Sequence, residues 1–359
     1  MTVVANVSRR RIYCRDDRRV DDVDRHLLVG DARTLLPTVA TATVDCVITS
    51  PPYFLLRNYQ HHQQLGLERS VDQWVTELRV VMKQLARILK PTGGVWLNLG
   101  DSYSRGPRYG APAKSLLLGP ERLLLDLMSD GWIVRNKVVW AKPNPMPASM
   151  KDRLTCSWEP VYFLVRSADY YFDLDAVREP HVSRKARGRV SREAKYESAH
   201  PQWAGPLAGT NDGLRRTREE GRAGHPLGKN PTDVWRLATA TFAGSHFAVY
   251  PERLIERPMQ LSCPERVCNQ CGRPWYRERR RERLGDMHAD CTCNAGWQPG
   301  LVLDPFLGSG TTAVVAERLG RRWKGIELNP AFARLAEQRI VEAQVRSHGD
   351  DVDATKVAA

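Results

Sequence analysis

A glycine-rich turn decides the fold of this chain, and it reads Asp304-Pro305-Phe306-Leu307-Gly308-Ser309-Gly310-Thr311-Thr312. Apolar residues 301–303 before it predict a short strand, and residues 311–319 after it predict a helix. Glycines at such a turn let a ligand approach the backbone, and the start of the helix offers free N–H groups. Glu327 ends the next predicted strand, where a carboxylate can bind both hydroxyls of a ribose. A lone Gly-x-Gly is usually only a turn, but the whole pattern favours a nucleoside cofactor.

Two other nucleotide classes fit this turn less well. It lacks the Gly-Lys-Ser/Thr ending of triphosphate-binding loops, and it lacks the third glycine of nicotinamide-dinucleotide sites. A nucleoside cofactor of another kind is therefore indicated.

A second turn, Thr49-Ser50-Pro51-Pro52-Tyr53, follows the apolar residues 44–49. Ligands of open α/β sheets bind at the carboxyl ends of strands. The prolines fix the backbone, so the Ser50 side chain and the Pro51 carbonyl can face one object, with Tyr53 as a flat platform. Taken alone, a proline-stiffened loop would explain this turn better.

Together the two turns resemble the β group of DNA amino-methyltransferases, in which a Ser-Pro-Pro-Tyr motif precedes an Asp-Pro-Phe-x-Gly-x-Gly motif. The resemblance covers roughly residues 26–180 and 228–345. Further blocks that resemble the family are Gly30-Asp31-Ala32, 98–103, 142–147, 170–173, 230–235 and 246–251.

The resemblance implies an α/β fold with a mostly parallel twisted sheet, a Rossmann-like methyltransferase that carries a target-recognition insertion. The spacing of four cysteines, described below, adds a small zinc-knuckle insertion to this expectation. It implies S-adenosyl-L-methionine as the cofactor and double-stranded DNA as the partner. The implied catalytic residues are Ser50, Pro51, Pro52 and Tyr53. The implied cofactor-binding residues are Asp31, Ala32, His246, Phe247, Asp304, Pro305, Phe306, Gly308, Gly310, Thr311, Glu327 and Asn329.

The chemistry implied is methyl transfer to an exocyclic amine of a base that is flipped out of the duplex. Tyr53 would stack on this base, while Ser50 and the Pro51 carbonyl accept hydrogen bonds from the amine. Methylation at cytosine C5 needs a cysteine nucleophile, normally in a Pro-Cys turn, and the chain has no Pro-Cys pair. Ser-Pro-Pro-Tyr is commoner among N4-cytosine enzymes of the family, so cytosine N4 is favoured and adenine N6 is the alternative.

The chain divides into seven segments around an alternation of strands and helices. Helices are expected over 71–89, 120–128 and 330 to about 345, and further strands over 95–99, 132–140, 161–165 and 323–326. The segments are a polar N-terminal arm (1–25), the catalytic half (26–180), the target-recognition insertion (181–227), a cofactor-closing segment (228–262), the zinc knuckle (263–297), the cofactor-binding half (298–347) and a frayed tail (348–359).

Four cysteines form two close pairs, Cys268-x2-Cys271 and Cys291-x-Cys293. Four soft thiolates suit tetrahedral zinc, so we expect a structural zinc site. The competing interpretation is a set of unligated thiols. Cysteines 14, 46, 156 and 263 are expected in the core.

The net charge is 54 − 41 = +13, with a sequence pI near 9.5, which favours a polyanionic partner over a merely solubilising surface once the motifs are considered. Residues 181–226 hold ten Lys/Arg against five Asp/Glu, and an Arg-rich stretch covers 273–283. No apolar run approaches the roughly 20 residues of a membrane span, and the N-terminus lacks an apolar signal core. We therefore expect a cytoplasmic, nucleoid-associated enzyme.

Several alternatives stay open at this point. A homodimer and a cognate restriction enzyme are both compatible with the sequence. Methylation of RNA or of a protein amide, or a catalytically inactive zinc-containing DNA-binding protein, are the competing functions.

Overall fold

The computed structural model describes residues 26–59, 61–181, 225–239, 250–278 and 283–356, with side chains to residue 345. Three expectations therefore lie outside the described residues: the arm 1–25, nearly all of the insertion 181–227, and the cofactor residues His246 and Phe247. Arginines 279–281 and the last three residues of the tail lie outside them too.

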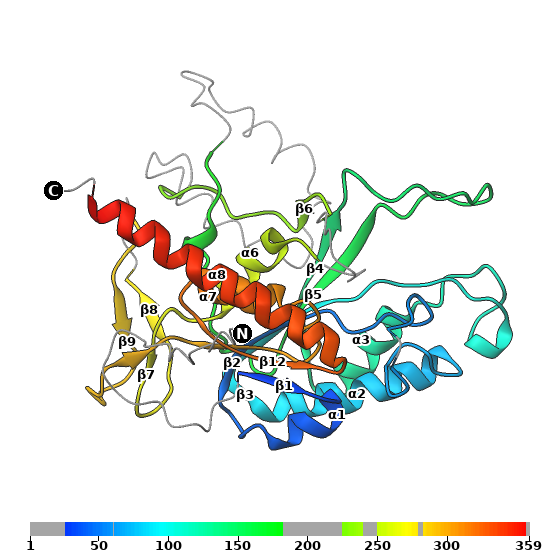
Figure 1. Cartoon of the computed structure of the whole chain (residues 1–359), viewed down its shortest axis with the longest axis horizontal. Coiled ribbons are helices and arrows are strands. Elements are labelled where there is room, and N and C mark those ends of the chain that lie inside the picture. The colour runs from blue at the N-terminus through cyan, green and yellow to red at the C-terminus, as the bar shows by residue number, and fades with distance from the viewer. Residues whose placement is uncertain (1–25, 60, 182–224, 240–249, 279–282, 357–359) are drawn as a thin grey trace, which may run out of the picture.

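The centre of the fold is an eight-stranded sheet with the order β1-β12-β11-β2-β3-β5-β4-β6 (Figure 1). Only β5 runs antiparallel to its neighbours in this sheet, so the prediction of a mostly parallel sheet is confirmed. The strands are β1 (Leu27–Val29), β2 (Val44–Thr49), β3 (Leu89–Asn98), β4 (Ile133–Ala141), β5 (Trp158–Val165), β6 (Val234–Arg236), β11 (Leu301–Asp304) and β12 (Arg322–Glu327).

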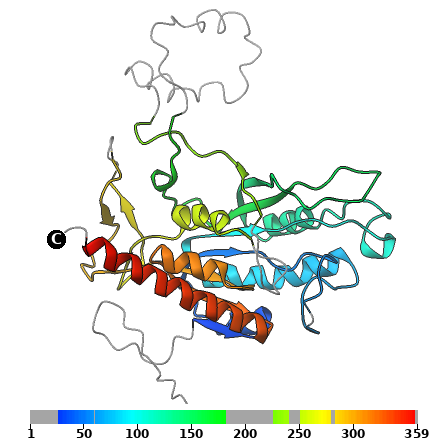
Figure 2. The same ribbon diagram turned by 45° about the horizontal axis from the view of Figure 1, so that its top comes forward.

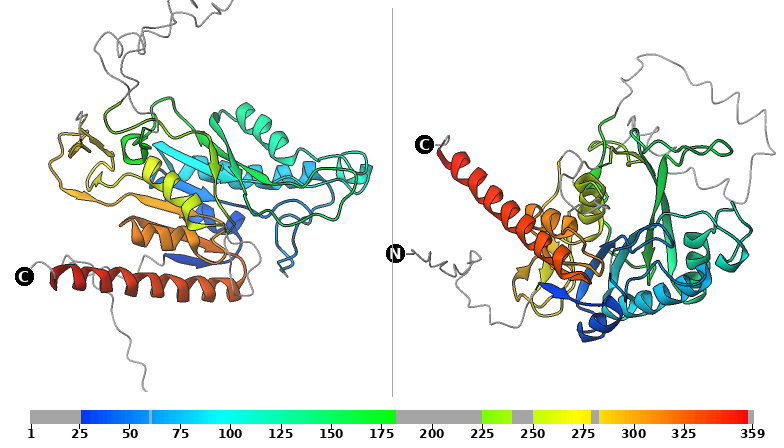
Figure 3. Two further views of the ribbon diagram at one scale, coloured as in Figure 1. Left: turned by 90° about the horizontal axis from the view of Figure 1, so that it is seen from above. Right: turned by 45° about the vertical axis from the view of Figure 1, so that its right-hand side comes forward.

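Helices cover both faces of this sheet. One face carries α2 and α3, and the other carries α6, α7 and α8, with α8 packed along α7 (Figures 2 and 3). The helices are α1 (Ala32–Leu35), α2 (Val71–Ile88), α3 (Gly119–Ser129), α6 (Glu252–Ser262), α7 (Thr311–Arg318) and α8 (Pro330–Lys356), with 3-10 turns η1 (Leu36–Thr38), η2 (Pro107–Tyr109) and η3 (Asp175–Val177).

The sheet has a hydrophobic core on each face, and strand β2 contributes to both. All six of its residues are buried, as expected for a parallel strand with helices on both faces. Val47 packs into the core under α2 and α3, whereas its neighbours Cys46 and Ile48 pack into the core under α6 and α7. Successive side chains point to opposite faces of a strand, so a short apolar run serves both cores.

The sheet order brings the two sequence motifs together. Strands β11 and β2 are parallel neighbours, with Val302 opposite Cys46 and Leu303 opposite Val47. The turns that follow them therefore leave the same edge of the sheet side by side. The Thr49 hydroxyl at the end of β2 donates to Asp304 Oδ1 at the end of β11, at 2.6 Å.

Two expectations about element boundaries were wrong. A break was expected between the helix 71–89 and the strand 95–99, but β3 begins at Leu89 directly after α2 and contains Pro91. The pairing of β2 with β3 shifts register over this stretch, which lets a proline lie inside a strand. The tail from His348 was expected to fray, but α8 continues to Lys356.

Residues 263–297 form a small appendage, which we call the knuckle. It holds two two-stranded antiparallel sheets, β7 (Val267–Cys268) with β10 (Trp297–Gln298) and β8 (Trp275–Arg277) with β9 (Met287–Ala289). Within the described part of the chain, no helix is both long enough and apolar enough to cross a membrane.

Candidate functional site

A cavity of about 860 Å³ opens at the carboxyl edge of the central strands. Its wall combines the turn after β2, the turn after β11, the end of β12 and the start of α1. The predicted site residues that line it are Asp31, Ala32, Ser50, Pro51, Pro52, Tyr53, Pro305, Phe306, Gly308, Thr311, Glu327 and Asn329. The two motifs therefore share one cavity.

The glycine-rich turn depends on backbone shapes that favour glycine. Gly308 and Gly310 have φ of +55° and +84°, in the left-handed region. A Cβ at Gly310 would also lie 3.0 Å from the Ala336 side chain of α8. Gly310 does not line the cavity, so its role is to shape the turn and to start α7.

Asp304 also differs from the expected cofactor contact, because it is fully buried and does not line the cavity. Its carboxylate accepts four hydrogen bonds, from the hydroxyls of Thr49, Thr312 and Tyr250 and from the Phe306 N–H, at 2.6–3.0 Å. Burial raises the pKa of Asp304, and these bonds oppose that rise. Asp304 therefore positions both turns instead of touching a ligand.

Glu327 has the position expected of a ribose-binding carboxylate. Its two oxygens accept the backbone N–H groups of Gly308 and Asn329, both at 2.8 Å. Each oxygen retains a second acceptor position, so the carboxylate can still accept two hydroxyls. Burial raises the pKa of Glu327 above its ordinary value. The residues at this end of the cavity fit a nucleoside.

Asp31 reaches the cavity as the N-cap of α1. Its Oδ1 accepts the Arg33 N–H at 2.8 Å, and its carboxylate pairs with the Arg33 guanidinium at 2.6 Å. Arg33 also pairs with Glu77 of α2 at 2.6 Å. The acidic turn is thereby fixed to α2.

The Ser-Pro-Pro-Tyr turn is fixed from two sides. Trp74 Nε1 of α2 donates to the Pro52 carbonyl at 3.0 Å. A Cβ at Gly100 would lie 2.5 Å from the Tyr53 ring, so only glycine leaves room for this ring. Burial raises the pKa of Tyr53 well above 10, so its hydroxyl stays protonated as a donor.

A polar network that the sequence analysis did not predict surrounds this turn. The Tyr53 hydroxyl donates to Glu159 Oε2 at 2.8 Å and lies 3.1 Å from Asn98 Oδ1. Asn98 Nδ2 donates to Glu159 Oε2 at 3.3 Å and to the Pro160 carbonyl at 3.1 Å. Lys142 forms an ion pair with Glu159 Oε1. We call Asn98, Glu159 and Lys142 the polar network.

Only part of this network had a signal in the sequence. Asn98 and Lys142 fall inside blocks that resemble the family, but no role was assigned to either. Glu159 lies in the antiparallel strand β5, far in sequence from both motifs, and only the sheet order brings it to the cavity.

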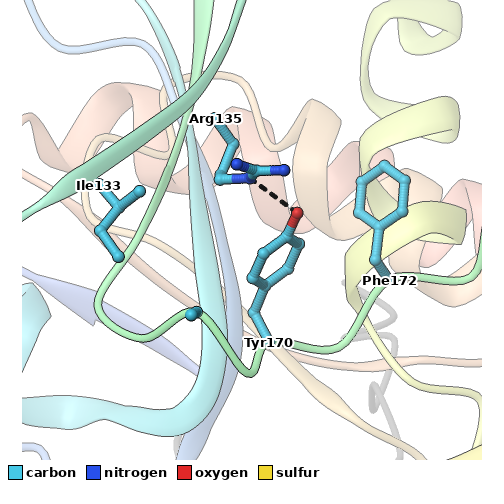
Figure 4. A pocket seen from close by; sticks show the side chains of 5 residues that line it. Ile133, Arg135, Tyr170 and Phe172 are labelled. Atoms are coloured by element: carbon cyan, nitrogen blue, oxygen red, sulfur yellow. Dashed lines mark hydrogen bonds between the residues drawn. The ribbon is translucent and has the colours of Figure 1, made fainter. Parts of the chain in front are cut away.

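A second, smaller pocket of about 360 Å³ lies beside β4. It is lined by Ile133, Arg135, Ala168, Tyr170 and Phe172, none of them a predicted site residue. Arg135 Nε donates to the Tyr170 hydroxyl at 2.8 Å, as Figure 4 shows. Its one charged side chain is thus already engaged.

The cysteine cluster assembles as the spacing predicted. The sulfur atoms of Cys268, Cys271, Cys291 and Cys293 all lie within 4.8 Å of one another. A soft, four-sulfur donor set fits zinc. None of the four residues lines the large cavity.

Comparison with known proteins agrees with this geometry. One relative is the type II methyltransferase M.Cfr9I of Citrobacter freundii, which is 32% identical over 93% of this chain and 91% of its own length. Another is the type II methyltransferase M.SfiI of Streptomyces fimbriatus, which is 30% identical over 90% of this chain and 93% of its own length. Among solved structures, the PvuII cytosine-N4-specific DNA methyltransferase aligns with a TM-score of 0.54 at 17% identity, covering 89% of this chain and 91% of its own, and so supports the fold.

A DNA modification methylase from Thermus thermophilus, solved with S-adenosyl-L-methionine, aligns with a TM-score of 0.50 at 21% identity, covering 89% of this chain and 93% of its own. The profile of the DNA methylase family N6_N4_Mtase matches residues 44–338. This span contains both motif turns and every strand of the cavity wall except β1. The chain therefore belongs to the N6/N4 DNA methylase family, the S-adenosyl-L-methionine-dependent DNA amino-methyltransferases.

Proposed function

We propose that this chain methylates the N4 amine of cytosine in double-stranded DNA. The observation that carries the proposal is the single cavity that joins the Ser50–Tyr53 turn to the Gly308–Glu327 end. The family acts on exocyclic amines, and the Ser-Pro-Pro-Tyr motif is the form commoner among its cytosine enzymes. Adenine N6 is the alternative substrate.

Bound S-adenosyl-L-methionine would supply an electrophilic methyl group, and Glu327, Asp31 and Phe306 would hold its nucleoside. The carboxylate of Glu327 would take the ribose hydroxyls through its two remaining acceptor positions. Asp31 and Phe306 line the same part of the cavity wall.

Tyr53 would form the platform for the flipped base. Its ring is fixed by the close approach of Gly100, and its hydroxyl is fixed by Glu159. A rigid ring loses little entropy when a base stacks on it, and such stacking contributes about 1–3 kcal/mol per base.

Ser50 would accept a hydrogen bond from the amine because its own proton has another acceptor. The Ser50 hydroxyl has two acceptors, Asn98 Oδ1 and the Tyr53 hydroxyl, each at 3.4 Å, and donation to either leaves the lone pairs of Ser50 for the base. Asn98 cannot turn its amide around, because Nδ2 is held by Glu159 and by the Pro160 carbonyl. The fixed orientation of Asn98 therefore keeps an acceptor oxygen facing the Ser50 hydroxyl.

Glu159 would stabilise the positive charge that develops on the amine. The amine becomes positive as it gains a methyl group, and a carboxylate fixed beside the platform stabilises that charge. Lys142 pairs with the far oxygen, Oε1, so that Oε2 faces Tyr53 and Asn98.

The loop 142–157, between β4 and β5, would contact DNA at the mouth of the cavity. Its residues Asn144 to Pro147 line the cavity, and Met146 and Leu154 are about nine-tenths exposed, at 87% and 90%. Apolar side chains at such a site can fill the space that a flipped base leaves. Lys151 lies on the same loop and suits a phosphate contact.

Ser50→Ala and Tyr53→Ala test these roles. Both variants should lose methyl transfer to DNA and keep binding of S-adenosyl-L-methionine, since neither touches the Glu327 end of the cavity. Radiolabelled methyl transfer and calorimetric titration of the cofactor measure the two properties. Loss of cofactor binding in both variants would contradict the assignment.

A further inference from the structure

We propose that the knuckle binds one zinc ion through Cys268, Cys271, Cys291 and Cys293, and that this ion fixes the knuckle at the amino ends of β2 and β11. The four sulfurs already lie within 4.8 Å of one another. In a tetrahedral site with Zn–S bonds of about 2.3 Å, sulfurs are about 3.8 Å apart. The present arrangement needs only small side-chain shifts to close around an ion.

The backbone around the first cysteine pair is shaped for a ligand turn. The Gly272 N–H donates to the Cys268 carbonyl at 2.9 Å, and Gly272 has φ of +69°, which favours glycine.

The second pair is held against the first by the backbone. The Asn269 N–H donates to the Gly296 carbonyl at 3.3 Å, and Asn269 Nδ2 donates to the Ala295 carbonyl at 3.1 Å. Strand β10 then pairs with β7, with Trp297 opposite Cys268. Two turns from distant parts of the knuckle are thus fixed face to face across the sulfurs.

The knuckle buries too little apolar surface to hold this shape by packing alone. In its described part, the large apolar side chains Tyr276, Leu284 and Trp297 are exposed by 38%, 48% and 44%. Its strands are two or three residues long. Units this small usually need a metal ion or disulfides, and the cysteines described here are all free.

A buried lysine supplies charge that suits a zinc tetrathiolate. Four thiolates around Zn²⁺ carry a net charge of −2. Lys90 Nζ donates to the Gly272 carbonyl at 2.9 Å, directly beside Cys271, and pairs with Asp45 at 2.7 Å. Its side chain is only 12% exposed, so its charge is little screened by solvent.

The same lysine connects the knuckle to the catalytic strands. Asp45 lies in β2, and its Oδ2 accepts the Leu301 N–H that begins β11, at 2.8 Å. These are the two strands that carry the motif turns at their other ends. The zinc is therefore structural: it lies at the amino ends of these strands, whereas the cavity lies at their carboxyl ends.

The test measures metal in the untagged, full-length protein. Elemental analysis should find about one zinc per chain, and replacement by Co²⁺ should give the strong thiolate-to-cobalt absorption of a tetrahedral four-sulfur site. The double variant Cys271→Ser/Cys293→Ser should lose the metal. Cys156 was expected in the core, but it is exposed and lies outside the cluster, so Cys156→Ser is the matched control and should keep the metal.

Thermal unfolding gives a second readout that does not depend on methyl transfer. A zinc chelator should lower the Tm of the wild-type protein and leave the Tm of the folded double variant unchanged. If that variant does not fold, the metal count and the cobalt spectrum of the wild-type protein still decide whether the four cysteines bind zinc. Folded wild-type protein without metal, with paired disulfides or with iron in place of zinc would overturn the proposal, whatever its activity.

Discussion

Replacing Asn98 with aspartate tests the role that we propose for the polar network. Asn98→Asp keeps the size of the side chain and the oxygen that accepts the Ser50 hydroxyl. It replaces the donor Nδ2 with a second oxygen, which faces Glu159 Oε2 at 3.3 Å and the Pro160 carbonyl at 3.1 Å. Two attractive contacts become repulsive, with almost no change of shape.

The distance between the side chains of residues 98 and 159 sets the size of the repulsion. Two like charges 3.3 Å apart repel by roughly 5 kcal/mol at an effective dielectric constant of about 20. Lys142 and small movements of Glu159, whose side chain is 22% exposed, offset part of this. About 1–3 kcal/mol should remain in the transition state, which corresponds to a kcat lower by roughly 5- to 150-fold.

Radiolabelled methyl transfer to unmethylated DNA measures kcat, and calorimetry should find cofactor affinity within about threefold of wild type. The repulsion raises the pKa of one carboxyl of the new pair, so the variant should regain activity relative to wild type as pH falls and a shared proton restores the hydrogen bond.

The double variant Asn98→Asp/Glu159→Gln provides the decisive control. Here the glutamine amide can donate to the aspartate, so the donor and acceptor are exchanged and the contact is restored. The double variant should therefore be more active than Asn98→Asp alone. A double variant that is no better than the single one would refute the network as the positioning device of Ser50.

Three further predictions concern Glu327 at the cofactor end of the cavity, the buried carboxylate of Asp304 and the net charge of the chain. Burial raises the pKa of Glu327 above its ordinary 4.5, so wild-type affinity for S-adenosyl-L-methionine should fall as pH drops through this raised value. Glu327→Gln should bind the cofactor weakly, and its affinity should not change with pH. Calorimetric titration of the cofactor at several pH values checks both expectations. Asp304→Ala removes the acceptor of four hydrogen bonds, and only the Tyr250 and Thr312 hydroxyls, 2.6 Å apart, can pair with each other instead. It should lower the free energy of unfolding by about 3–5 kcal/mol in urea titrations, and Asp304→Asn, which keeps the shape, should lower it less. With a net charge of +13, DNA binding should weaken steeply with salt in gel-shift assays, and a flat dependence would contradict contact with phosphates.

Much of the fold could be predicted because its signals are local. The helix α2 has apolar residues at regular spacing and a Ser70 cap, and the structure places it at Val71–Ile88, one residue short of the prediction. The short apolar strands and the two motif turns are equally local. Parallel order follows from the alternation of strands and helices, so the meeting of the two turns could be expected as well.

What could not be predicted depends on contacts distant in sequence. Glu159 reaches Tyr53 across 106 residues because β5 enters the sheet antiparallel beside β3, and nothing within β5 indicates that direction. The motif position of Asp304 suggests a ligand contact, but two of its four hydrogen-bond donors, Thr49 and Tyr250, lie far from its own turn in sequence. The partner of the knuckle, Lys90, lies 182 residues before Gly272.

The identity of the methylated base tests the account most directly. Unmethylated DNA is incubated with the purified protein and S-adenosyl-L-methionine, digested to nucleosides and analysed by mass spectrometry, with Tyr53→Ala as the control. We predict N4-methylcytosine from the wild-type protein and none from the variant. N6-methyladenine as the product would contradict the cytosine assignment, and no methylated nucleoside would contradict the proposed catalytic site.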